Sequence, residues 1–146
     1  MNMKKIFITL AIAIASITVV SADDFPVDFK KLPKAAQQFI KTNFPKDKVS
    51  FATVDDDIMY PEYQVALASG VMIEFKNDGR LESIKTRTGN IPGGIIPVQI
   101  LEEVKTRYPE ATVTEYEVGR YGYEVKLSNR LELKFNSSFK LVEIDD

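Results

Sequence analysis

The chain has 146 residues with 19 basic and 21 acidic side chains, and it contains neither cysteine nor histidine. A chain of this length normally forms one compact domain with a single hydrophobic core. The slightly acidic balance gives no electrostatic reason to bind phosphate backbones, so nucleic acid is not an expected partner. Without cysteine there is no disulfide, and stability must come from apolar burial and from hydrogen bonds between strands.

The first 22 residues have the layout of a secretory signal peptide. Two lysines precede an apolar run from Ile6 to Val20, and small residues follow up to Ala22. The run is shorter than the roughly 20 residues that span a bilayer, and the acidic pair Asp23-Asp24 follows it. We expect cleavage after Ala22, which predicts a periplasmic or secreted protein without a transmembrane span. Its remaining 124 residues carry 17 basic and 21 acidic side chains, a net charge of −4.

Two stretches of the chain resemble each other. Leu32 to Pro45 aligns with Ile96 to Pro109 at an offset of 64, and the two share both prolines and a Lys-Thr pair. Tyr63 to Ser69 aligns with Tyr123 to Asn129 at an offset of 60, so the first copy has four extra residues before Tyr63. Self-similarity of this kind indicates a tandem repeat.

Each copy begins with a helix signal. Apolar side chains recur every three or four residues from Leu32 to Phe44 and from Ile96 to Tyr108, which is the spacing of one helix face. A proline near the start of each stretch fits the first helical turn, and a proline directly after each stretch prevents its continuation. We therefore expect two helices of about eleven residues.

Strand signals follow each helix, because apolar and polar residues now alternate with a period of two. Short turns at Ser69-Gly70 and Ser128-Asn129 join two of the expected strands in each copy into a hairpin. The expected strands are Val49 to Val54, Tyr63 to Leu67, Val71 to Phe75 and Leu81 to Lys85, and then Thr112 to Val118, Tyr123 to Leu127, Leu131 to Phe135 and Lys140 to Ile144.

The stretch from Thr86 to Gly94 has no periodicity and is rich in glycine, so it marks the boundary between the copies. The predicted organisation is a signal peptide over residues 1–22, a first repeat over 23–88 and a second over 89–146. A unit of about 60 residues buries too little surface alone, so the two repeats should form one compact domain. The predicted fold is α+β, with a helix and four antiparallel strands in each repeat, a shared antiparallel sheet and both helices on one face.

The sequence contains few of the side chains that usually act in catalysis. Proton transfer, nucleophilic attack and metal catalysis draw mostly on His, Cys and activated Ser, and no nucleophile elbow, phosphate-binding loop or glycine fingerprint occurs. The pair Glu102-Glu103 consists of adjacent helix residues, which do not face each other. We therefore predict a protein that is not an enzyme and that needs no cofactor.

The candidate partner-binding residues lie first in the insertion before Tyr63. Asp55 to Asp57 lack the spacing of a calcium-binding loop and fit a solvated turn, so no metal site is predicted. The apolar residues that follow could bind a partner or simply cover the end of the sheet. Tyr121, in the corresponding loop of the second copy, leaves the same two alternatives. The candidates in these loops are Asp57, Ile58, Met59, Tyr60 and Tyr121.

The second candidate surface is the sheet face that the helices leave open. Met72 and Glu74 are its candidate binding residues, and a simple solvated face is the alternative. The outward positions are Gln64, Ala66, Met72, Glu74, Glu124, Lys126, Glu132 and Lys134.

The motifs in both copies resemble the PepSY-like family of β-lactamase-inhibitor-like proteins, which are exported proteins common in Bacteroidetes. They are the helix ending in Phe44-Pro45 or Tyr108-Pro109, the hairpin from Tyr63 to Phe75, and Asn77-Asp78-Gly79. The resemblance extends from about Leu32 to Ile144 and implies a tandem α+β fold whose sheet and loops grip an enzyme. None of the inhibitory residues of such proteins can be matched to a position here.

These features predict a periplasmic protein-binding module, with inhibition or modulation of an exported enzyme as its expected role. The alternative is a protein that binds a small ligand or an envelope component in a pocket between sheet and helices. A purely structural role in the envelope is a third hypothesis.

Overall fold

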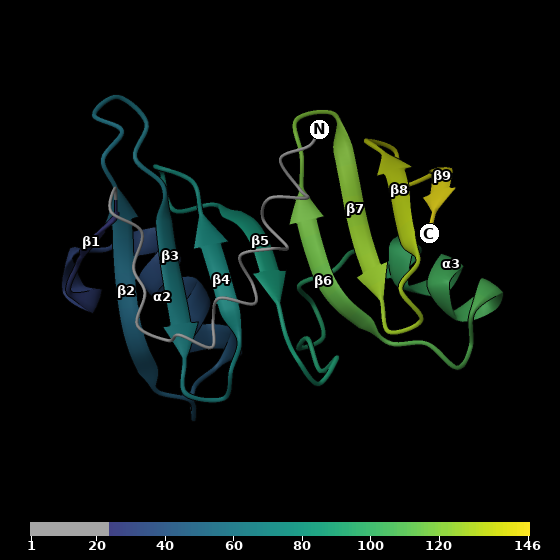
Figure 1. The fold of residues 1–146 in the computed structure, drawn as a ribbon, viewed down its shortest axis with the longest axis horizontal. Helices are drawn as coiled ribbons and strands as arrows, with labels where there is room; N and C mark the ends of the chain where they lie inside the picture. Colours follow the sequence, from purple (N-terminus) through teal and green to yellow (C-terminus); the bar gives the residue numbers. More distant parts are fainter. Residues whose placement is uncertain (1–23) are drawn as a thin grey trace.

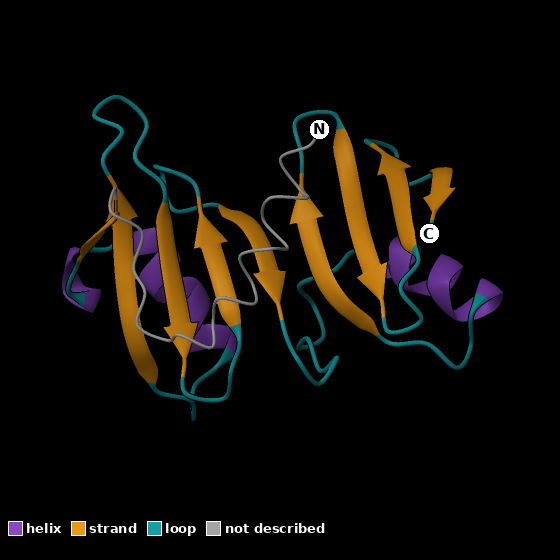
Figure 2. Cartoon of the chain, viewed as in Figure 1, coloured by secondary structure: helices purple, strands orange, loops and turns teal. Residues whose placement is uncertain are grey.

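The computed structural model describes residues 24–146, so the expected signal peptide and its cleavage site lie outside the described residues. One nine-stranded antiparallel sheet carries two α-helices on one of its faces (Figure 1 and Figure 2). The predicted α+β class with an antiparallel sheet is confirmed. None of the helices among residues 24–146 is long and apolar enough to cross a membrane.

Neighbouring strands in the sheet are also neighbours along the chain, from β1 at one edge to β9 at the other. A 3-10 turn, η2 (Phe29–Lys31), and helix α2 (Lys34–Asn43) lie between β1 and β2, and helix α3 (Val98–Arg107) lies between β5 and β6. The strands are β1 (Asp24–Pro26), β2 (Val49–Asp55), β3 (Tyr63–Leu67), β4 (Met72–Phe75), β5 (Leu81–Lys85), β6 (Val113–Val118), β7 (Gly122–Leu127), β8 (Glu132–Asn136) and β9 (Leu141–Asp145).

The sheet has one strand more than the eight that the sequence predicts. The additional strand, β1, pairs with β2 through Asp24 opposite Asp55 and Pro26 opposite Thr53. Its three residues are too few for an alternating pattern, and proline is confined to edge strands or strand ends. The edge position of β1 explains why Pro26 is tolerated there.

Both helices lie between two prolines, as expected, but each begins only at the residue after its first proline. Pro33 and Pro97 lie at the N-cap position and not inside the first turn. The carbonyl oxygen of Pro33 accepts the N–H groups of Ala36 and Gln37 at 3.0 and 3.1 Å, which closes the first turn of α2. At the other end, the N–H of Phe44 donates to Ile40 at 2.8 Å, and Pro45 then ends the helix.

The strands before and after α3 pair directly. Ser83, Ile84 and Lys85 of β5 lie opposite Glu117, Tyr116 and Glu115 of β6, which makes the sheet continuous. One hydrophobic core includes buried residues of both helices and of the strands on both sides of this joint. The largest fully buried side chains in it are Phe75, Ile73, Ile84, Ile100, Leu133, Val65 and Val125.

Gly79 brings the β4–β5 turn against the start of α2. Its φ of +90° is a conformation that side chains rarely adopt, and a Cβ atom here would lie 2.9 Å from Cβ of Pro33 and 3.0 Å from N of Ala36. The turn and the helix can approach this closely only because residue 79 has no side chain.

Candidate functional site

The β2–β3 loop projects beyond the end of the sheet (Figure 1). Ile58, Met59 and Tyr60 in this loop are 94%, 72% and 64% exposed. Large apolar side chains are seldom exposed three in a row in a soluble protein, since their burial is favourable. Of the two alternatives for this loop, covering of the sheet end does not fit these exposures.

Two aspartates hold the β2–β3 loop in shape. Oδ1 of Asp57 accepts the N–H groups of Met59 and Tyr60, both at 3.0 Å. Oδ1 of Asp55 accepts those of Asp57 at 3.2 Å and Glu62 at 3.1 Å. The carboxylate of Asp57, a predicted contact residue, therefore braces the backbone that carries the exposed apolar side chains.

A shorter turn joins β6 to β7 at the same end of the sheet as the β2–β3 loop (Figure 1). The N–H of Gly119 donates to the carbonyl oxygen of Gly122 at 2.8 Å, which closes the turn. Tyr121 at its tip is 81% exposed, and the guanidinium carbon of Arg120 lies 5.8 Å from the centre of its ring. The structure thus brings Tyr121 and the β2–β3 loop to one end of the sheet, which we call the loop end.

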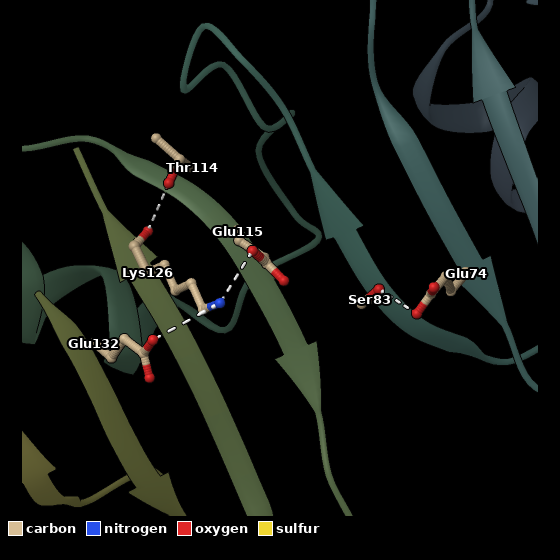
Figure 3. Close-up of polar contacts among 6 residues, drawn as sticks. All are labelled: Glu74, Ser83, Thr114, Glu115, Lys126 and Glu132. Carbon is tan, nitrogen blue, oxygen red and sulfur yellow. Dashed lines mark hydrogen bonds and ion pairs between the residues drawn. The ribbon is translucent and has the colours of Figure 1, made fainter. Parts of the chain in front are cut away.

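The other two predicted site residues lie on the open face of β4. The Glu74 carboxylate accepts a hydrogen bond from Ser83 Oγ at 3.0 Å (Figure 3). It accepts another from Gln64 Nε2 at 3.3 Å. Burial raises the pKa of Glu74, and repulsion by Glu62 and Glu117 adds to this rise, while the hydrogen bonds from Ser83 and Gln64 oppose it. Met72 starts β4 at the end of the strand far from the loops, so the structure does not bring it to the loop end.

Glu82 is a functional candidate that sequence reasoning missed. Burial raises its pKa to about 7, and repulsion by Glu62 and Glu74 adds to this rise while Lys76 opposes it. Its Oε1 atom is buried and makes no hydrogen bond. The pairing of β4 with β5 shifts by one residue between Glu74 and Phe75, close to Glu82. The alternation of apolar and polar residues along a strand does not reveal such a shift, so the sequence did not indicate the position of Glu82.

The open face of β6 to β8 holds a second charged group. Lys126 Nζ lies 3.6 Å from Glu115 Oε1 and 3.7 Å from Glu132 Oε2 (Figure 3). The Glu115 side chain is only 6% exposed, so this pair is largely removed from water. Next to it, Lys134 Nζ lies 3.2 Å from Asp145 Oδ2. Of the outward positions predicted from the sequence, Lys126, Glu132 and Lys134 thus form ion pairs within the sheet face.

Two hollows adjoin the loop end on the open face, with volumes of about 90 and 210 Å³. Pockets for small organic ligands usually enclose about 300 to 1,000 Å³, so both hollows are smaller than is typical. The first is lined by Asp24, Thr53, Asp55, Glu62, Tyr63, Gln64 and Glu74, and the second by Glu117, Gly119, Tyr121, Gly122, Tyr123, Glu124, Lys134 and Phe135. Within residues 24–146, no group of three or more acidic side chains is placed to hold a metal ion.

Solved structures of three bacterial proteins resemble this fold closely. A protein of Bacteroides thetaiotaomicron described as a "putative calcium-regulated periplasmic protein" is 40% identical with a TM-score of 0.82, covering 87% of this chain and 100% of its own. A periplasmic protein of Bacteroides vulgatus from the DUF2874 family is 35% identical with a TM-score of 0.80, at the same coverage. A second protein of that species, described as of unknown function, is 30% identical with a TM-score of 0.79, covering 84% and 99%.

No curated protein matches the chain. A family model described as "Putative beta-lactamase-inhibitor-like, PepSY-like" matches residues 18–60 and 61–143, which is most of the sequence. The family expected from the sequence motifs is thereby confirmed. The chain belongs to the PepSY-like family of β-lactamase-inhibitor-like proteins, and its structural relatives are described as periplasmic.

Proposed function

We propose that the protein is a periplasmic protein-binding module that modulates an exported enzyme, and that it binds this enzyme through the loop end. The exposure of Ile58, Met59 and Tyr60 is the observation that carries the proposal. Such side chains contribute binding free energy when a partner covers them, and aromatic residues are enriched among the strongest contributors.

The conformation of the β2–β3 loop supports this role. The hydrogen bonds from the loop backbone to Asp55 and Asp57 fix the loop before a partner arrives. A loop that is already ordered loses less conformational entropy on binding, so more of the contact energy appears as affinity. Tyr121 extends the same surface across the sheet end.

The relatives support a periplasmic location and an inhibitor-like role, but they do not identify the binding surface or the partner. The family description contains the term inhibitor-like, and the three solved relatives are described as periplasmic. Calcium regulation is part of the description of one of them only. Our proposal for this chain involves neither a metal ion nor catalysis, and it relies on contacts between proteins alone.

We also infer that the two halves, residues 23–88 and 89–146, are copies of one unit that form one domain. The order of a helix and four strands in α2 to β5 recurs in α3 to β9. The pairing shifts recur as well, since the irregularity near Val49 in β2 has a counterpart near Val113 in β6. The shift at Phe75 likewise has a counterpart at Phe135.

The proposed cleavage after Ala22 follows from the sequence alone and has a direct test. The full chain is expressed in a bacterial host, and the protein recovered from the periplasm is analysed by intact mass spectrometry. A mass that corresponds to a chain beginning at Asp23 supports the proposal, and any other N-terminus contradicts it.

The function is tested by capture and by kinetics. The protein recovered from the periplasm is immobilised and exposed to a periplasmic extract of the source bacterium, and bound proteins are identified. We expect one exported enzyme to be enriched, and its rate to change when the soluble protein is added. The Met59→Ala/Tyr60→Ala double variant should bind at least tenfold more weakly, because contacts of this kind are worth about 1 to 2 kcal/mol each.

Val98→Ala is the matched control, because it removes an apolar side chain that is exposed on α3, away from the loop end. Equal binding by the double variant and by the wild type excludes the loop end as the binding surface. If no enzyme is enriched but a small molecule or envelope polymer raises the melting temperature of the protein, the protein is a ligand-binding protein and our proposal is wrong. A ligand at 100 times its dissociation constant should add about 2.7 kcal/mol.

A further inference from the structure

The two helices lie on the same face of the sheet but carry very different charge. Residues 30–48, which comprise the end of η2, α2 and the loop to β2, contain six lysines and a single acidic residue. Residues 94–112, which align with them around α3, contain two basic and three acidic residues. The six lysines, which are all exposed and which we call the lysine face, are Lys30, Lys31, Lys34, Lys41, Lys46 and Lys48.

The lysines are not required for packing. α2 buries Ala36 and Ile40 against the sheet, and α3 buries Ile100 and Val104 in the same way with few basic residues around it. Val98 in α3 aligns with Lys34 in α2. Because the fold is built without these charges in one half, the lysine face calls for an explanation other than stability.

Local contacts join the lysines into one surface. Gln37 Nε2 donates to the carbonyl oxygens of Lys30 at 3.1 Å and Leu32 at 2.8 Å, which ties the η2 turn to the first turns of α2. Lys41 Nζ lies 5.9 Å from the centre of the Phe29 ring, so the last turn of α2 also adjoins η2. Asp47, the single acidic residue, is occupied by hydrogen bonds from the Ser69 hydroxyl and backbone.

We propose that the lysine face docks the protein electrostatically on a bilayer surface that contains anionic phospholipid. Lysine presents a mobile point charge, whereas arginine makes the planar paired contacts typical of specific recognition, and no arginine precedes Arg80. Protein interfaces are depleted in lysine and enriched in aromatic residues and arginine, so an acidic protein surface is a poorer fit. A diffuse anionic surface attracts lysines without requiring defined geometry.

The charges on the open sheet face favour an orientation in which the helices, and not the open face, meet the bilayer. Glu62 and Glu74 line the first hollow on the open sheet face, and Glu82 interacts with both of them, so an anionic bilayer repels this face. Docking by the lysine face therefore turns the open face away from the bilayer. The loop end lies at the ends of the strands, between the two faces of the sheet (Figure 2), so this orientation leaves it accessible.

The test measures partitioning onto lipid vesicles. Protein recovered from the periplasm is sedimented with vesicles of phosphatidylcholine, with and without 40% phosphatidylglycerol, at about 20 mM and 500 mM salt. We expect binding only to the anionic vesicles and only at low salt, because salt screens exposed charges. The Lys30→Gln/Lys31→Gln/Lys34→Gln variant should partition roughly a hundredfold more weakly, about fivefold for each lysine, which corresponds to about 1 kcal/mol per residue.

The matched control removes three exposed charges elsewhere, in the Arg87→Gln/Lys105→Gln/Lys140→Gln variant, and should bind like the wild type. Circular dichroism and melting temperature establish that both triple variants are folded. If both variants bind the anionic vesicles equally more weakly than the wild type, the overall charge of the protein determines binding and not the lysine face. That result would overturn the proposal. Absence of binding to anionic vesicles, equal binding to neutral vesicles, or binding to poly-glutamate beads but not to vesicles would each overturn it as well.

Discussion

At the scale of single residues, the open face of β3 to β6 concentrates like charges. Burial raises the pKa of Glu82 from its usual 4.5 to about 7, with repulsion by Glu62 and Glu74 as further causes. Between these two pH values the folded chain holds a proton that the unfolded chain releases. The stabilisation due to this group is therefore fully present below about pH 4.5 and is lost as the pH rises through 7.

The Glu82→Gln variant, which stays neutral, should therefore gain stability over the wild type as the pH rises. We expect no difference near pH 4.5 and an advantage of about 1 kcal/mol at pH 8, a value reduced to allow for solvent screening of a partly exposed group. Urea denaturation at both pH values measures the difference. Glu102→Gln, on the exposed surface of α3, serves as the control with no such trend. An advantage that is independent of pH would falsify this account.

The sequence predicted which residues form the loop end but not what each of them does. Ile58, Met59, Tyr60 and Tyr121 are exposed where an apolar run in a loop and a tyrosine between glycines suggested. The contacts of Asp57 with the backbone and of Lys126 with Glu115 depend on turn geometry and on strand register. Alternation along one strand tells which face a residue occupies and not which residue lies opposite, so these roles required the structure.

At the scale of secondary-structure elements, prolines and glycines fix where helices and turns meet. Helix ends were predictable because proline lacks an N–H, whereas β1 was not, since it has three residues and exists only through its pairing with β2. The close approach of the β4–β5 turn to α2 could not be predicted from the sequence either. Asn77-Asp78-Gly79 indicates a turn but not which element the turn contacts.

Gly79→Ala should destabilise the protein through this contact. The added Cβ meets Cβ of Pro33 and N of Ala36, and the backbone at φ +90° becomes strained. We expect a loss of about 2 to 3 kcal/mol, measured by urea denaturation. Gly94→Ala is the matched control, because Gly94 has a similar φ of +95° but no atom within 4 Å of the added Cβ. Its loss should stay near 1 kcal/mol, and equal losses in both variants would show that the contact with α2 is unimportant.

At the scale of the whole molecule, the β5–β6 joint decides whether the two halves act as one. Ile84 of β5 lies opposite Tyr116 of β6 and is completely buried in the common core. Each half alone would bury only about 60% of its surface, which makes a separate stable fold difficult. The coupling of the halves also matters for the loop end, because Tyr121 and the β2–β3 loop belong to different halves.

Ile84→Ala should therefore weaken the entire molecule and not one half of it. Removing this fully buried side chain at the joint should cost about 3 kcal/mol, and unfolding should remain a single transition. Hydrogen exchange followed by mass spectrometry checks this, because amides of β3 and β7 should lose protection by the same amount. Loss of protection confined to β2 through β5, or a second unfolding transition, would mean that the halves fold independently. The loop end would then be two surfaces whose relative position varies, and Tyr121 would drop out of the proposed binding surface.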